Sequence, residues 1–246
     1  MAKQKQAINR GIYLLPNLFT TAGLFAGFYA IVSAMNSDFH IAAIAIFVAM
    51  IADMLDGRVA RMTQTESSFG AEYDSLTDIV AFGVAPALVV YSWGLSELGK
   101  LGWLIAFIHT AAMALRLARF NSQINQSEKS FFTGLPAPAA AGVVVGFVWL
   151  HHDLGYVGNG SILAAIITVL VSILMVSTVR YYSFKDFELK GKVPFVAILC
   201  IVLVFVGISV DPPKVLFATF AIYALSGPVW TLRKKGLRGF KRFVGR

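Results

Sequence analysis

The sequence predicts an all-α, polytopic helical membrane protein with about eight transmembrane helices. Of its 246 residues, 57% are hydrophobic and only 14% are charged, whereas a soluble domain is about 25% charged. Apolar runs of about 20 residues recur along the chain, and a run of that length crosses the hydrocarbon core of a bilayer as a helix. We therefore expect a single membrane domain over residues 1–246.

The expected spans follow one another with short connections. Long apolar runs mark them, such as IAAIAIFVAMIA in the second, IVAFGVAPALVVY in the third and VPFVAILCIVLVFVGI in the seventh. The spans cover residues 15–35, 39–62, 73–95, 99–122, 136–152, 160–180, 193–210 and 214–232. Residues 1–14 are expected as a juxtamembrane surface segment, and Pro16 suits the first turn of the first span, where its missing N–H loses no hydrogen bond.

The basic residues predict the orientation. With the N-terminus in the cytoplasm, all of the 21 Lys and Arg residues except Lys100 and Lys214 fall on the cytoplasmic side. Both termini are therefore expected to be cytoplasmic. The net charge of +8 is concentrated in the tail, residues 233–246, which we expect to lie against anionic lipid headgroups. Membrane lipids, and not nucleic acid, are the partners that this charge indicates.

Four aspartates stand out because they lie at the ends of two apolar spans. Asp53 and Asp56 are three residues apart near the end of the second span, and Asp74 and Asp78 are four residues apart at the start of the third. Residues at these spacings share one face of a helix. Since a short connection joins the two spans, we expect the pairs to face each other near the cytoplasmic surface.

This cluster of carboxylates predicts a metal site. Four carboxylates at close quarters repel one another, and a bound divalent cation relieves the repulsion. Ligands that are all oxygen favour Mg²⁺, Mn²⁺ or Ca²⁺ over zinc, and two ions suit four carboxylates and a phosphate substrate. The alternative is a solvated loop in which Arg58 and Arg61 neutralise the aspartates. Carboxylates within membrane segments are usually functional, which favours the metal site.

The stretch from residue 53 to residue 78 reads D-x2-D-G-x2-A-R-x8-G-x3-D-x3-D. Its fixed positions are Asp53, Asp56, Gly57, Ala60, Arg61, Gly70, Asp74 and Asp78. This pattern resembles the signature of the CDP-alcohol phosphatidyltransferases. The resemblance implies an integral membrane enzyme, usually a homodimer, in which the hydroxyl of a small polar alcohol displaces CMP from a CDP-linked lipid.

The resemblance also implies a role for each aspartate of the motif. Asp53, Asp56 and Asp74 correspond to metal ligands, and Asp78 corresponds to the catalytic base with a share of the metal. The metal is implied to be Mg²⁺ or Mn²⁺, with Ca²⁺ as a further candidate, at two ions per site. Such ions neutralise the diphosphate, and a carboxylate can take the proton of the attacking hydroxyl.

The other motif positions are implied to bind the CDP-lipid. Gly57, Ala60 and Gly70 make room for the cytidine, and Asp53 lies beside them. Arg61 contacts the nucleotide or phosphate, or braces the carboxylates.

Two further candidates for CDP-lipid binding come from the segment PNLFTT, outside the motif. Asn17 and Thr20 lie at the cytoplasmic start of the first span, where they can reach a diphosphate. Capping of the helix end is the alternative role for these residue types.

Two other segments, together with the eight-span length, bear on the acceptor alcohol. LRLARFN, residues 115–121, ends the fourth span, and FFTGLPAPAAA, residues 131–141, begins the fifth. They resemble the integral-membrane branch of bacterial phosphatidylserine synthases, although archaeal relatives and phosphatidylcholine synthases share parts of the pattern. That branch implies CDP-diacylglycerol and L-serine as substrates, and a location in the inner (cytoplasmic) cell membrane with the site facing the cytoplasm.

Five residues are candidates for binding serine. Arg116 and Arg119 are one helical turn apart, and an arginine fork can grip a carboxylate with two hydrogen bonds. Asn121, Thr133 and free N–H groups around Gly134 can add polar contacts. The alternative for the two arginines is ordinary positive charge on the cytoplasmic side.

The sequence also allows other acceptors and another class of protein. Choline would need an aromatic cage, for which Phe120, Phe131 and Phe132 are available. Glycerol phosphate or inositol phosphate would need more cations than serine does. A cation or proton transporter would place carboxylates near the bilayer midplane and often show internal duplication, whereas these aspartates cluster at one edge. His109, in the fourth span, is expected to be packed and hydrogen-bonded rather than a ligand.

Overall fold

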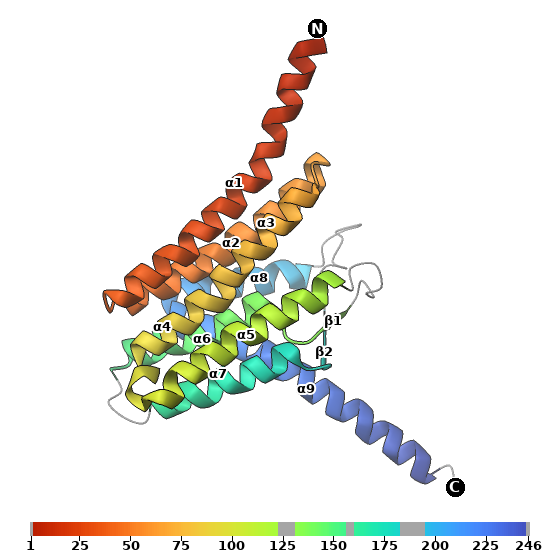
Figure 1. Ribbon diagram of the computed structural model, residues 1–246. Coiled ribbons are helices and arrows are strands. Elements are labelled where there is room, and N and C mark those ends of the chain that lie inside the picture. The colour runs from red at the N-terminus through yellow and green to blue at the C-terminus, as the bar shows by residue number, and fades with distance from the viewer. Residues whose placement is uncertain (1, 123–130, 156–159, 183–194, 245–246) are drawn as a thin grey trace.

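The computed structural model describes residues 2–122, 131–155, 160–182 and 195–244, which are mostly helical (Figure 1). The helices are α1 (Ala2–Met35), α2 (Phe39–Thr63), α3 (Ser68–Asp78), α4 (Ala85–Trp93), α5 (Lys100–Ser122), α6 (Ala137–Asp153), α7 (Gly160–Val176), α8 (Phe195–Val210) and α9 (Pro212–Val244). A π-helical turn, η1 (Ile79–Val84), joins α3 to α4 in one continuous rod, and a short 3₁₀ helix, η2 (Leu95–Leu98), precedes α5.

The prediction of a helical membrane protein is confirmed. Within the described residues, 4 helices are long and apolar enough to cross a bilayer, namely Leu15–Met35, Phe39–Thr63, Ser68–Trp93 and Lys100–Ser122. Gly160–Val176 is a shorter apolar helix. That about eight helices cross the membrane, and that both termini are cytoplasmic, stay predictions.

Both ends of the chain are helical in the structure. Pro16 lies inside α1 rather than in a first turn, because the helix already begins at Ala2. A proline inside a helix removes one backbone hydrogen bond, and a helix of 34 residues retains enough others to continue through it. At the other end, α9 continues through the basic tail as far as Val244.

A two-stranded antiparallel sheet is the feature that the all-α prediction missed. β1 (Phe131–Thr133) pairs with β2 (Arg180–Tyr182), with Phe132 opposite Tyr181. The buried Tyr181 holds β2 against α9, because its hydroxyl donates to the Ala224 carbonyl at 2.9 Å. The sheet therefore links the α5–α6 connection to the end of α7 and to α9.

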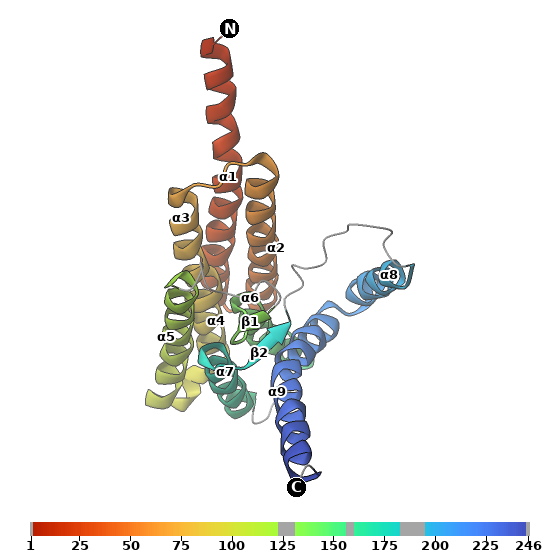
Figure 2. The same ribbon diagram turned by 90° about the vertical axis from the view of Figure 1, so that its right-hand side faces the viewer.

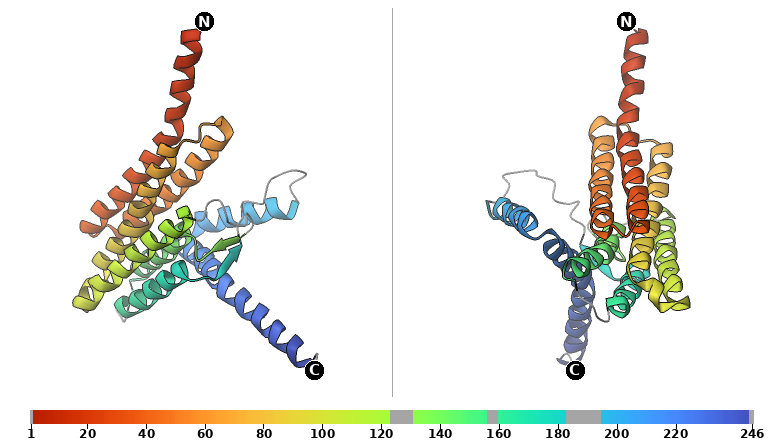
Figure 3. Two further views of the ribbon diagram at one scale, coloured as in Figure 1. Left: turned by 45° about the vertical axis from the view of Figure 1, so that its right-hand side comes forward. Right: turned by 90° about the vertical axis from the view of Figure 1, so that its left-hand side faces the viewer.

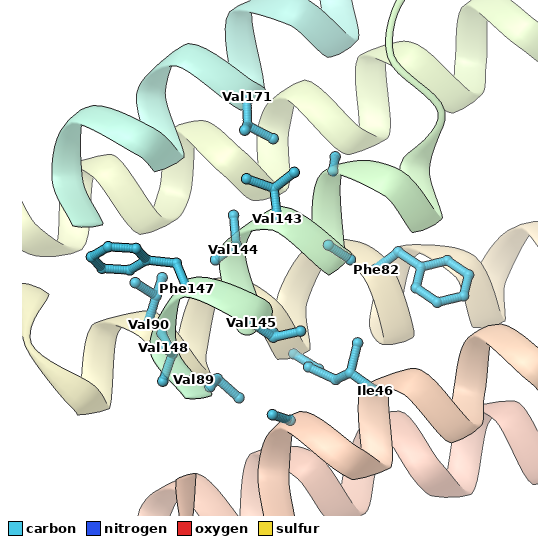
Figure 4. Packing of buried hydrophobic residues seen from close by; sticks show 14 of the residues in the cluster. Ile46, Phe82, Val89, Val90, Val143, Val144, Val145, Phe147, Val148 and Val171 are labelled. Atoms are coloured by element: carbon cyan, nitrogen blue, oxygen red, sulfur yellow. The ribbon is translucent and has the colours of Figure 1, made fainter. Parts of the chain in front are cut away.

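α6 is the central helix of the bundle. It is buried from Ala139 to Trp149 and packs against α2, α4, α7 and α9. Figure 4 shows its valines among buried side chains of α2, α4 and α7. Glycines allow α9 to approach closely, since a Cβ at Gly142 would lie 2.7 Å from the ring of Phe220 and one at Gly146 would lie 3.2 Å from the backbone of Phe217.

The first three helical rods form one wall of the molecule. α1, α2 and the α3–α4 rod run side by side (Figures 1 and 3), whereas α8 stands away from them and packs mainly on α9 (Figure 2). Because α1 passes beside both partners, the end of α2, the end of α3 and the middle of α1 meet in one place. The four aspartates of the motif lie at this junction.

Candidate active site

The four aspartates line one small pocket between α1, α2 and the α3–α4 rod. The lining residues are Thr20, Gly23, Ala49, Asp53, Asp56, Asp74, Thr77, Asp78, Ala81 and Phe82. The helical spacings explain the arrangement, because each aspartate pair occupies one face of its helix and both faces point to α1.

The spacing of the carboxylates fits a divalent cation. Asp53, Asp56 and Asp74 each offer one oxygen, and these oxygens lie within 4.8 Å of one another. Two oxygens on opposite sides of a Mg²⁺ or Ca²⁺ ion are about 4–5 Å apart. These three residues could therefore hold an ion together, and Asp78 lies beside them in the same pocket.

Thr20 orients one of the carboxylates. Its hydroxyl lies 2.8 Å from Oδ2 of Asp56 and donates to it, and both side chains are buried. The carbonyl of Pro16, at 3.1 Å, is a second acceptor for the same proton. α1 thus contributes a group that supports a candidate metal ligand, a role that commonly orients carboxylates at metal sites.

The other candidates for CDP-lipid binding surround the cluster without lining the small pocket. A Cβ at Gly57 would lie 3.4 Å from Nη1 of Arg61, and one at Gly70 would lie 3.4 Å from Oδ1 of Asn17. Gly57 therefore faces the arginine of its own helix, and Asn17 of α1 reaches the start of α3. Ala60 is half-buried on α2, one position before Arg61.

Three neighbouring polar atoms lack a hydrogen-bond partner. Among the described residues, Oγ1 of Thr77, Oδ1 of Asp78 and Nε of Arg116 are buried and unpaired. The positive charge of Arg116 acts on Asp78, whose other charged neighbours are aspartates of the cluster. Buried polar groups normally have partners, so this place is suited to a polar ligand. Sequence reasoning missed Thr77, although it lies one helical turn after Asp74 on the same face.

Arg119, one turn after Arg116, has a different environment. Its guanidinium donates to the carbonyls of Val176 at 2.8 Å, of Met175 and Ser177 at 3.2 Å, and of Thr133 at 3.4 Å. A cation at the C-terminal end of a helix is favourable because the last carbonyls carry partial negative charge. Arg119 thus ties the ends of α5 and α7 to β1.

The backbone around Gly134 differs from the expectation of free N–H groups. The N–H of Gly134 donates to the Val179 carbonyl at 2.8 Å, and that of Leu135 donates to the Leu174 carbonyl at 3.0 Å. Both donors are used because this turn packs on the end of α7. Asn121 donates through Nδ2 to the Ser75 hydroxyl at 3.1 Å, which joins α5 to α3.

The aromatic residues proposed as a choline cage pack partly on other rings. Phe131 stacks on Trp230 of α9 with centroids 5.3 Å apart and meets Tyr182 edge-on at 5.9 Å. Phe120 is exposed at the end of α5.

Comparison with known proteins identifies the family. The protein-family model described as CDP-alcohol phosphatidyltransferase matches residues 13–176, which include every residue that lines the pocket. The chain belongs to the CDP-alcohol phosphatidyltransferase family. The prediction that it is an enzyme of this family, made from the aspartate motif, is confirmed.

Several curated relatives carry one name, CDP-diacylglycerol–serine O-phosphatidyltransferase. One from Helicobacter pylori (strain 26695) is 39% identical over 215 residues, which are 87% of this chain and 90% of the relative. One from Bacillus subtilis (strain 168) is 36% identical over 171 residues, 70% of this chain and 91% of the relative. One from Methanocaldococcus jannaschii is 38% identical over 175 residues, 66% of this chain and 80% of the relative.

Proposed function

We propose that this protein transfers the phosphatidyl group of CDP-diacylglycerol to L-serine. The serine hydroxyl oxygen forms a bond to the β-phosphorus, the bond from that phosphorus to CMP breaks, and CMP leaves with the bonding electrons. The products are phosphatidylserine and CMP. The four-aspartate pocket carries the proposal, because it joins a candidate metal site to unpaired polar groups beside Asp78, and the names of the relatives support serine as the acceptor.

Asp53, Asp56 and Asp74 are the residues that would hold the divalent cation, with Asp78 available to a second one. Bound there, Mg²⁺ or Mn²⁺, or Ca²⁺ as a third candidate, supplies positive charge that neutralises the diphosphate and the departing CMP. Thr20 keeps Asp56 in its orientation through the hydrogen bond between them.

Asp78 takes the proton from the serine hydroxyl in this proposal. Its Oδ1 is buried and has no hydrogen-bond partner, so it has a free position for a hydroxyl donor. A general base must lie within hydrogen-bond reach of the proton that it removes. Arg116 on α5 lies close enough for its charge to act on the same carboxylate.

Arg116 is the residue that we assign to the serine carboxylate. It is buried, its Nε lacks a hydrogen-bond partner, and it lies close enough to Asp78 to act on it. Serine carries its carboxylate and hydroxyl a few ångströms apart, so one molecule can contact both residues. Arg119, Thr133 and Gly134 belong to the hydrogen-bonded region where α5 and α7 end. Asn121 links the end of α5 to α3.

Phosphate-bearing acceptors and choline fit this arrangement less well. Glycerol phosphate and inositol phosphate bring about two negative charges, whereas Arg116 is the cation assigned here, and four hydrogen bonds to carbonyls engage Arg119. Choline has no carboxylate for Arg116 to bind. The family match and the names of the relatives, which are transferases, argue against a cation or proton transporter.

The deciding experiment is an alcohol panel with purified full-length protein in detergent–lipid micelles. CDP-diacylglycerol and Mn²⁺ are supplied with serine, choline, glycerol phosphate, inositol phosphate or no alcohol, and released CMP and the lipid product are measured. Phosphatidylserine with serine alone is the expected result. CMP release with a different alcohol would redirect the acceptor, and no release with any of them would reject the transferase.

The proposal also covers the membrane location and the oligomeric state of the enzyme. The basic segments support an inner, cytoplasmic cell membrane with the site facing the cytoplasm. A homodimer is proposed from the family resemblance alone.

An Arg116→Ala variant is expected to raise the KM for serine about tenfold or more. Losing a hydrogen bond to a charged group costs roughly 1.5–3 kcal/mol, and the KM for CDP-diacylglycerol should change far less. Arg119→Ala is the matched comparison on the next turn. It should lower the thermal unfolding midpoint more than Arg116→Ala does, because it releases the end of α7. An unchanged serine KM in Arg116→Ala would remove this residue from the serine site.

A Gly57→Leu variant is expected to weaken CDP-diacylglycerol binding strongly while the protein still folds. The larger side chain would enter the space between α2 and the Arg61 guanidinium, where we place the nucleotide. Gly57→Ala is the control. Its Cβ meets only the flexible end of Arg61, at 3.4 Å, so binding should stay near wild type. Normal binding by Gly57→Leu would argue against a cytidine pocket here.

A further inference from the structure

The helical rod that carries Asp78 changes its geometry directly after that residue. η1 is a π-helical turn over Ile79–Val84, and two of its residues, Ala81 and Phe82, line the pocket together with Asp78. π-helical turns are rare, are less favourable than α-helix, and occur often at functional sites. Such a turn needs contacts from neighbouring elements to keep its shape.

Two helices pack closely on this turn. A Cβ at Gly27 of α1 would lie 2.8 Å from Cα of Ala81, and a Cβ at Gly83 would lie 2.9 Å from Cγ of Met113 on α5. Neither glycine position has room for a side chain. The turn is therefore held between the backbone of α1 and the Met113 side chain of α5, with little freedom to shift.

His109 on α5 adds a polar contact at the centre of this packing. Its side chain is fully buried, with an exposed fraction of 0%. Nε2 lies 3.4 Å from the carbonyl oxygen of Phe82, and Nδ1 lies 3.3 Å from the hydroxyl of Ser172 on α7. His109 thus joins three elements, α5, η1 and α7, and is outside the pocket lining.

The hydrogen-bond partners of His109 favour one tautomer of its imidazole. A neutral imidazole has one N–H and one acceptor nitrogen. The Phe82 carbonyl only accepts, so the bond to it requires the hydrogen on Nε2. The Ser172 hydroxyl, which donates to the Thr168 carbonyl at 2.6 Å, then has Nδ1 at 3.3 Å as a second, weaker acceptor for the same proton. The other tautomer would set the Nε2 lone pair against the Phe82 carbonyl oxygen, which is repulsive, and would lose this hydrogen bond.

We infer that His109 is a positioning residue that holds Asp78 in its reactive orientation through the Phe82 carbonyl and the π-helical turn. This inference rests on the proposed function, in which Asp78 takes the serine proton. His109 does not touch substrate. Its contact with the Phe82 carbonyl fixes the position of the π-helical turn that follows Asp78. A shift of that turn would displace the Asp78 carboxylate, and small displacements of a reacting group have large effects on rate.

Two substitutions separate this role from simple packing. His109→Gln keeps an amide N–H near the place of Nε2, so the bond to the Phe82 carbonyl can persist. His109→Asn is shorter, so it leaves the Phe82 carbonyl without that donor. Ser172→Ala is a control that removes the partner of Nδ1 and leaves the Phe82 bond intact.

We expect His109→Asn to lower kcat about tenfold or more, with the KM for CDP-diacylglycerol within about twofold of wild type. His109→Gln and Ser172→Ala should retain most of the rate. Deuterium exchange at the amides of η1 should rise in His109→Asn and stay near wild type in the other two. Equal rates and equal exchange in His109→Asn and His109→Gln would overturn the inference. So would a loss of rate that follows the thermal unfolding midpoint across all three variants.

The exchange measurement keeps the inference separate from the proposed function. If wild-type protein releases no CMP with any alcohol, the proposed reaction fails. In that case, faster exchange of η1 in His109→Asn alone would still support the hold on the turn, and uniform exchange among the three variants would reject it.

Discussion

An Asp78→Asn variant is expected to lose kcat by at least about 10²-fold, which is the lower end of the contribution of a general base. The substitution preserves the size of the side chain and most of its hydrogen-bonding capacity, but removes its ability to accept a proton. Affinity for CDP-diacylglycerol should change far less, because Asp53, Asp56 and Asp74 still offer their oxygens to a cation. The measurements are kcat, CDP-diacylglycerol binding and a Mn²⁺ titration.

The titration distinguishes two roles for Asp78. If this residue is mainly a ligand of a second ion, the affinity for metal and CDP-lipid should fall together with kcat. Asp211→Asn is a suitable control, since it makes the same chemical change at an aspartate outside the pocket that pairs with Lys214 at 2.6 Å. A kcat for Asp78→Asn within a few-fold of wild type would exclude both roles.

Removal of metal is expected to abolish activity, and Asp56→Ala should produce the same loss in the presence of metal. Activity should disappear in EDTA and return with Mg²⁺ or Mn²⁺. Asp56 is buried, accepts the hydrogen bond from Thr20, and belongs to the set of three carboxylates within 4.8 Å. Its loss should therefore weaken cation binding and CDP-diacylglycerol binding together. The effect should be larger than that of removing an exposed carboxylate.

The fold of Asp56→Ala should survive, because one fewer carboxylate reduces repulsion within the cluster. Circular dichroism and the thermal unfolding midpoint check this point, and Asp211→Ala serves as the control for an aspartate elsewhere. Full turnover by metal-stripped wild-type protein would reject the metal role of the pocket, whatever the variant does.

The helical character and the position of the aspartates were readable from the sequence. Long apolar runs specify helices because a backbone in lipid must satisfy its own hydrogen bonds, and the observed bounds of α2 and α5 lie close to the predicted spans. The motif between Asp53 and Asp78 identified the family, because eight fixed positions in one hairpin are a local pattern. Helical periodicity then indicated which carboxylates share a face.

The partners of the arginines could not be read in the same way. Arg116 and Arg119 are one turn apart and look alike in sequence, yet the charge of one acts on Asp78 while the other binds the carbonyls at the end of α7. That difference depends on where α7 ends, 57 residues farther along the chain. The β1–β2 pairing likewise depends on two segments brought together by the packing of α7 and α9.

The sequence by itself determined the membrane class, the helices and the four carboxylates, because each is encoded by residues within a few turns of one another. Only the tertiary structure decided that Thr20 supports Asp56, that Thr77 faces the pocket, and that His109 reaches the carbonyl of Phe82. These contacts join side chains and backbone groups from different helices. Their geometry follows from how closely the helices pack at residues such as Gly27 and Gly83. The distance between two packed helices cannot be predicted from a short-range pattern in the sequence.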